Sequence, residues 1–175
     1  MLTKLLQPRA NRRLIADLHR GLVAAARRPT LFLPPYSVSD TLEGRFDLLV
    51  LLAVLLLRRL EKLPPPGPEI AQEIVNTMFD HLDADLREMG VGDLAVPKRM
   101  KKLAGIFGGR SAAYREALDR DGAAFTAVIA RNVYGSDNVD ERSAALATYC
   151  NKAVADLERT DLAGILAGSL FPDPE

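Results

Sequence analysis

An uninterrupted run of ten apolar residues, Leu48 to Leu57, is the feature that most constrains the fold. As a helix this run is about 15 Å long, half of the roughly 30 Å hydrocarbon core of a bilayer, so it is too short to span a membrane. Because it presents apolar side chains in every direction, such a helix must be surrounded by other elements. We therefore expect it to begin at a cap at Asp40 or Thr41, to end near Glu61, and to lie at the centre of a helical bundle.

Most of the remaining chain has apolar residues at the three- and four-residue spacing of amphipathic helices. Within residues 1–30, for example, Leu14, Leu18 and Leu22 share one face and arginines occupy the other. No stretch alternates in the manner of a strand. We predict an all-α fold, a single-domain bundle of about six or seven helices around the central apolar helix. The other helices are expected at about 14–28, 69–89, 97–118, 122–134, 139–159 and 161–167.

Two proline-rich segments interrupt these helices. Pro29, Pro34 and Pro35 surround the apolar residues 31–33, and we expect them to end the first helix and to hold an extended apolar connector. Residues 64–68, four prolines and a glycine, form a stiff break that is too short to separate two domains.

Composition favours one folded domain in a reducing compartment. A chain of 175 residues, 48% of them hydrophobic, can bury a sizeable core. Basic and acidic residues are equal in number, 23 each, which gives no sign of a general nucleic-acid binder. Cys150 is the only cysteine and excludes an internal disulfide. The N-terminus is basic like a transit peptide but has no serine before Ser37, so we expect a cytoplasmic protein.

Charge changes sign within one loop of the segment 78–102. Acids precede the loop, with Arg87 as the only cation among them, and cations follow it. This layout indicates a surface that binds partners rather than a pocket for chemistry. The predicted partner-binding residues are Asp80, His81, Asp85, Arg87, Glu88, Asp93, Lys98, Arg99, Lys101 and Lys102.

The four cations after the loop allow two interpretations. Cations at a helix N-terminus oppose the helix dipole, so something should compensate for them. One interpretation is pairing across the turn with Asp83, Asp85 or Glu88. The other is docking to RNA, lipid phosphate or an acidic protein. No aromatic residue stands among these lysines, which disfavours sequence-specific recognition of nucleic acid.

The loop itself is predicted to be a structural turn formed by Gly90, Gly92 and Pro97. Gly90 is expected to end one helix in the left-handed conformation, and Pro97 to be the first residue of the next. Asp93 is expected to bind backbone N–H groups in the turn. The spacing of the glycines does not match a phosphate-binding loop.

His81, Asp85 and Glu88 fall on one edge of a predicted helix. A metal site, a buried polar network with an arginine and a solvated helix edge are all compatible with this spacing. No other predicted helix offers matching metal ligands, and no activated-serine motif accompanies the two histidines, His19 and His81. We therefore predict no catalytic residue, no metal and no cofactor. An enzyme with a carboxylate-based metal site is the disfavoured alternative.

Two segments, DTLEGRFDLLVLLAVLLLRRL at 40–60 and MFDHLDADLREMGVGDLAVPKRMKK at 78–102, resemble the ubiquinol–cytochrome c chaperone family. The similarity spans roughly residues 30–150. On this basis we divide residues 1–175 into a basic N-terminal helix (1–30), a chaperone-family core (31–160) and a C-terminal tail (161–175).

The resemblance implies a non-enzymatic assembly chaperone that receives newly made cytochrome b and assists assembly of the cytochrome bc complex. For eukaryotic relatives it also implies contact with the ribosome and with a small partner chaperone. Apolar surface for such a client is expected at the connector 31–33 and on the helices around the charged turn. The alternative function is a peripheral membrane- or RNA/ribosome-binding helical module that uses residues 1–28 and 98–102. Besides the cytoplasm, the alternative location is a peripheral position on the inner face of the membrane.

Overall fold

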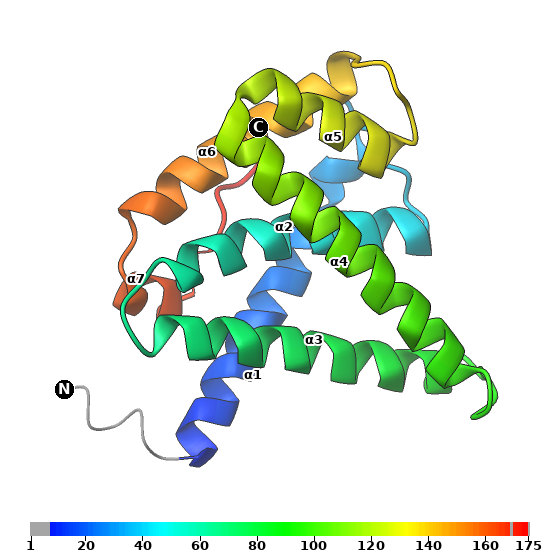
Figure 1. Ribbon diagram of the computed structural model, residues 1–175, viewed down its shortest axis with the longest axis vertical. Coiled ribbons are helices and arrows are strands. Elements are labelled where there is room, and N and C mark those ends of the chain that lie inside the picture. The colour runs from blue at the N-terminus through cyan, green and yellow to red at the C-terminus, as the bar shows by residue number, and fades with distance from the viewer. Residues whose placement is uncertain (1–7, 169, 175) are drawn as a thin grey trace.

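The computed structural model describes residues 8–168 and 170–174, so the first seven residues of the predicted segment 1–30 and two residues of the predicted tail lie outside it. The described residues form seven α-helices and one short 3₁₀ helix, with no strand among them (Figure 1). The prediction of an all-α fold is confirmed. The elements are α1 (Pro8–Ala26), η2 (Pro29–Phe32), α2 (Leu42–Glu61), α3 (Gly67–Glu88), α4 (Val96–Arg120), α5 (Gly122–Tyr134), α6 (Glu141–Arg159) and α7 (Leu162–Leu166).

The apolar helix α2 lies at the centre of the bundle, as its sequence predicts. Nine of the ten residues from Leu48 to Leu57 are buried, and Leu49 is half-buried. Five helices pack against α2, namely α1, α3, α4, α5 and α6 (Figure 1). Across the described residues, every helix is either too short or too polar to cross a bilayer.

A cap and a close backbone contact fix the start of α2. The Thr41 side chain accepts a hydrogen bond from the Gly44 N–H at 3.1 Å, so Thr41 is the N-cap. A Cβ atom at Gly44 would lie 2.0 Å from the carbonyl oxygen of Ser39, and only glycine fits there. The local sequence thus sets the position at which the central helix begins.

The prediction of an extended connector at residues 31–33 is wrong. Residues 29–32 form the 3₁₀ helix η2, in which the Leu31 N–H donates to the Arg28 carbonyl at 3.1 Å. The fixed φ of Pro29 suits the first turn of a helix, and the turn places Leu31 in the core. Only Leu33 is exposed, at 57%, so the segment offers far less apolar surface than expected.

The end of α1 is bonded to the C-terminal segment. The Arg28 guanidinium donates to the carbonyl oxygens of Phe171, at 3.1 Å, and Pro172, and to the Tyr149 hydroxyl at 3.3 Å. Phe171 is itself buried in the core. These contacts hold the C-terminal segment and the residue after α1 against α6.

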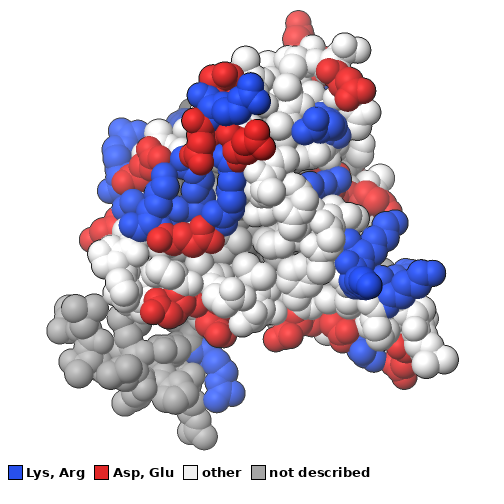
Figure 2. Space-filling view, in the orientation of Figure 1, with Lys and Arg blue, Asp and Glu red and all other residues white. Residues whose placement is uncertain are grey.

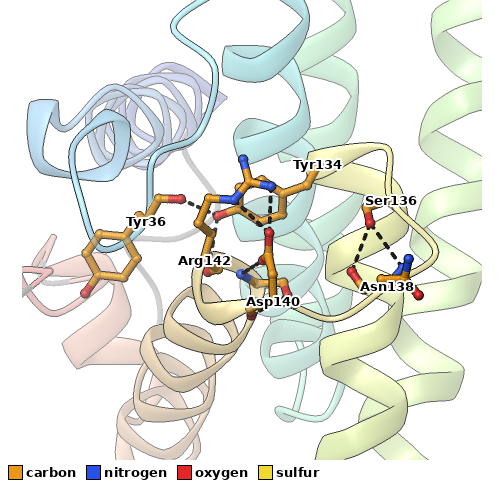
Figure 3. A network of polar contacts seen from close by, with 7 residues as sticks. Tyr36, Tyr134, Ser136, Asn138, Asp140 and Arg142 are labelled. Carbon is orange, nitrogen blue, oxygen red and sulfur yellow. Dashed lines mark hydrogen bonds and ion pairs between the residues drawn. The ribbon is translucent and has the colours of Figure 1, made fainter.

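A polar network joins the α5–α6 loop to the segment after η2 (Figure 3). The Tyr134 hydroxyl donates to the Tyr36 carbonyl at 2.7 Å, and the Arg142 guanidinium lies 4.9 Å from the centre of the Tyr134 ring. The Asp140 carboxylate binds Arg142 and also caps α6 by accepting a hydrogen bond from the Ser143 N–H, while the Asp140 N–H donates to the Ser143 hydroxyl. Burial raises the pKa of Tyr134, which therefore stays a neutral donor.

Because Leu52 is surrounded on all sides, we expect Leu52→Ala to lower the free energy of unfolding by about 2–5 kcal/mol. Denaturant unfolding monitored by circular dichroism measures this loss. Leu33→Ala, at an exposed position, is the control and should change stability by less than about 0.5 kcal/mol. Equal stabilities for the two variants would mean that α2 is not the centre of the core.

Candidate functional site

The charged segment forms a helical hairpin made of α3 and α4, which meet at the lower right of Figure 1. Gly90 ends α3 with a φ of +80°, the left-handed conformation predicted for it. The Val91 N–H then donates to the Leu86 carbonyl at 3.1 Å, and the Gly90 N–H to the Arg87 carbonyl at 3.0 Å. This pair of bonds is a Schellman motif, so the turn geometry follows directly from the glycine.

The second helix of the hairpin begins one residue earlier than predicted. Val96 is its first residue, and Pro97 occupies the second position. Proline is tolerated there because the N–H groups of the first turn have no partner within the helix. Val96 is fully buried, and its contact with the core favours the earlier start. Before it, the Ala95 N–H donates to the Gly92 carbonyl at 2.7 Å.

Arg87 holds the turn together through two carboxylates. Its Nε lies 2.6 Å from Asp83 Oδ2, and its Nη1 lies 2.6 Å from Asp93 Oδ1. Hydrogen bonding to Asp83 is the main reason why the pKa of Arg87 is raised. Asp93 was expected to bind backbone N–H groups, but its carboxylate binds Arg87 instead, because a guanidinium is the stronger donor within reach.

The charged residues on either side of this bridge do not pair across the turn. The side chains of Asp80, Asp85 and Glu88 on α3 are exposed, and so are those of Lys98, Arg99, Lys101 and Lys102 on α4. Within the described residues, none of these seven groups takes part in an ion pair. The interpretation in which the lysines neutralise the acids is therefore wrong: Asp83 pairs with Arg87, and the other charges point into solvent.

The two signs of charge occupy different parts of the hairpin surface. Figure 2 shows acidic side chains along the lower edge, where α3 runs, and a group of basic side chains over the first part of α4. No atom would contact a Cβ added at Gly105, Gly108 or Gly109, so this part of α4 is open to solvent. Along this hairpin, the exposed acids therefore lie on α3 and the exposed bases on the first part of α4.

An open groove of about 500 Å³ lies next to this hairpin, between α1, the start of α2 and α3. Its apolar wall consists of side chains from all three helices, and charged side chains stand around it. The apolar lining is Val23, Leu42, Phe46, Leu49, Met78 and Leu82, and the charged lining is Arg20, Arg27, Arg45 and Asp85. Of the predicted residues, His81 and Asp85 line this groove.

A histidine pair joins α1 to α3 in the groove. The Nδ1 atoms of His19 and His81 are 3.1 Å apart, so one ring donates a hydrogen bond and the other accepts it. His19 is buried and His81 is exposed. Burial, reinforced by the charge that His81 can carry, lowers the pKa of His19 from 6.5 to about 4 against an opposing effect of Asp85.

The pair revises what the sequence indicated for His81. His81, Asp85 and Glu88 are all exposed, as the solvated-edge interpretation predicts, but the hydrogen-bond partner of His81 is a histidine of another helix and not an arginine. Within the described residues, no three His, Cys, Asp or Glu side chains are placed to hold a metal. The sequence did carry one signal for His19: it stands directly after Leu18 on the apolar side of α1, where a polar residue needs a buried partner.

Comparison with known proteins identifies the family. The profile of the ubiquinol-cytochrome C chaperone family matches residues 36–171. The chain belongs to this family. It also matches the crystal structure of the Cbp3 homolog from Brucella abortus, with a TM-score of 0.81 and 34% sequence identity over 99% of this chain and 97% of that chain. A search of curated proteins returned no significant match.

The stability of this ubiquinol–cytochrome c chaperone family member should depend on pH because His19 is buried beside the groove. The unfolded chain protonates His19 near its ordinary pKa of 6.5, whereas the folded protein resists protonation down to about 4. Stability should therefore be complete above pH 6.5 and fall as the pH drops from 6.5 to 4. We expect a loss of about 1–3 kcal/mol from this group over that window.

Denaturant unfolding at closely spaced pH values tests this expectation, with His19→Gln as the comparison. The variant keeps a polar group at the position but cannot titrate, so its stability should vary less between pH 6.5 and 4. Parallel pH profiles for the two proteins would contradict the assignment of the acid sensitivity to His19.

Proposed function

We propose that this protein is a non-enzymatic assembly chaperone that binds unassembled cytochrome b and assists assembly of the cytochrome bc complex. The observation that carries the proposal is membership in the ubiquinol–cytochrome c chaperone family over residues 36–171. The near full-length match to a Cbp3 homolog supports it. Because such a client belongs to a membrane complex, the proposed work takes place at the inner face of the membrane.

The groove between α1, α2 and α3 has the chemistry that this role requires. A chaperone for a membrane protein must cover apolar side chains and still release them, which favours an open apolar surface with a polar rim. Phe46, Leu49 and Leu82 supply the apolar wall without being fully buried. Met78 forms the buried floor of the groove beneath them.

The rim gives the groove a preference for charge as well. Arg20, Arg27 and Arg45 stand on one side, and Asp85 stands near the histidine pair. Arg20 and Arg45 are held by Asp17 and Asp40, at 2.6 and 2.7 Å, which keeps their side chains ordered but exposed. Since Arg20 and Arg45 are already paired, Arg27 is the rim cation that an acidic side chain of a client would meet. Contact with a ribosome or a small partner chaperone would use surface outside the groove.

Leu42 offers a direct test because it lies at the mouth of the groove and is 62% exposed. We expect Leu42→Asp to reduce the amount of cytochrome b that co-precipitates with the protein by about fivefold or more, since a charge opposes the burial of apolar client surface. The fold should be unaffected because an acid in the first turn of α2 interacts favourably with the helix dipole.

Val139→Asp is the matched control, since Val139 is an exposed apolar residue, at 53%, in the α5–α6 loop far from the groove. Its capture of cytochrome b should equal that of the unmodified protein. The groove would lose its proposed role if both variants captured the client normally, and cytochrome b as the client would be refuted if the unmodified protein captured none.

A further inference from the structure

The end of the α3–α4 hairpin exposes apolar side chains that the fold does not use. We define the hairpin tip as residues 89–94. Leu94 is 99% exposed and Met89 is 54% exposed, whereas Val96, two residues later, is fully buried. Figure 1 places the tip at a corner of the molecule, away from the packed helices. An aliphatic side chain held entirely in water at a protruding turn loses nothing by entering an apolar phase.

The first turns of α4 carry a dense positive charge next to this tip. We define the basic stripe as Lys98, Arg99, Lys101 and Lys102. All four side chains are exposed, and none has an ion-pair partner among the described residues. Lys98, Lys101 and Lys102 share one face at helical spacing. Gly105 and Gly109 continue that face without side chains, so a broad flat surface can approach it.

The acids of the hairpin leave the stripe unopposed. Arg87 binds both Asp83 and Asp93, and its single positive charge offsets one of these two negative charges. The exposed acids near the turn that form no ion pair within the described residues, Asp80, Asp85 and Glu88, all belong to α3, and none lies on α4 beside the stripe. Figure 2 shows the acidic side chains along the lower edge and the basic group above them on α4, so an approaching anionic surface can meet the bases first.

We propose that the hairpin docks on an anionic phospholipid bilayer, with the basic stripe on the lipid headgroups and Leu94 inserted between them. Charge complementarity supplies the attraction, and the exposed apolar tip adds a contact that headgroups at a bilayer surface can accept. RNA would satisfy the cations, but it would leave Leu94 in water, and the stripe lacks the aromatic residues on which bases stack. The proposal concerns a surface outside the groove and does not depend on the client.

Vesicle flotation with the full chain tests the docking. The protein should float with phosphatidylcholine vesicles that contain phosphatidylglycerol, should not float with phosphatidylcholine alone, and should be released by high salt. Replacing Lys98, Lys101 and Lys102 with alanine should lower the bound fraction by about tenfold or more, since each cation near the surface contributes about fivefold. The control replaces three exposed cations elsewhere, Lys62, Arg120 and Arg131, and should bind as the unmodified protein does.

Insertion of the tip can be followed separately because the chain has no tryptophan. Leu94→Trp should give a fluorescence spectrum that shifts to the blue on addition of anionic vesicles, whereas Val139→Trp, at the exposed α5–α6 loop, should not shift. The proposal is overturned if the unmodified protein does not float with anionic vesicles, or if the stripe variant floats as well as the control. It is also overturned if Leu94→Trp shows no shift, or if single-stranded RNA binds the stripe more tightly than the vesicles do.

Discussion

The burial of α2 is the constraint on which the rest of the structure depends. A helix that is apolar on every side is stable in water only when other elements surround it, and α1, α3, α4, α5 and α6 do so here. Each large side chain buried in this way contributes about 1.5–3 kcal/mol, so the run Leu48–Leu57 is a major source of stability for the core. The surrounding helices consequently use one face for α2 and leave the opposite face for other contacts.

Apolar burial is not directional, so it does not fix how the neighbouring helices cross α2. Polar bonds near the two ends of α2 fix that orientation. Asp47, in the second turn, pairs with Arg110 of α4, and burial raises the pKa of this carboxyl despite the arginine. At the other end, Arg58 binds Asp119 at 2.6 Å, and Arg59 donates to the Thr160 carbonyl at 2.7 Å. A half-buried pair such as Asp47–Arg110 adds little net stability. A different register of the two helices would, however, leave both charges without a partner, which is strongly destabilising. These bonds therefore fix which way α4 and the chain before α7 cross the central helix.

Features set by neighbouring residues could be predicted from the sequence, and features set by distant residues could not. The cap of α2 and the left-handed Gly90 depend on a few adjacent positions: the sequence predicts Gly90 outright and narrows the cap to Asp40 or Thr41, of which Thr41 is the N-cap. The His19–His81 pair joins residues 62 positions apart, and only the packing of α1 on α3 brings them together. The charges of the hairpin show a third case, because several partners were available and Arg87, the nearest cation, took Asp83 and Asp93. The sequence shows that several cations could pair with these acids, but it does not show which of them wins this competition.

The same competition explains why the hairpin surface is unusual for a stable helical protein. Once Arg87 binds two acids, the cations at the start of α4 face an unfavourable helix dipole, which costs about 0.3–1 kcal/mol each where exposed. Acidic residues at these positions would have stabilised the fold, and the described structure contains no compensating contact. The large core around α2 tolerates this loss. On the proposal that the hairpin docks on an anionic bilayer, the lipid headgroups would offset this cost, because they would supply the negative charges that the described structure does not place beside the stripe.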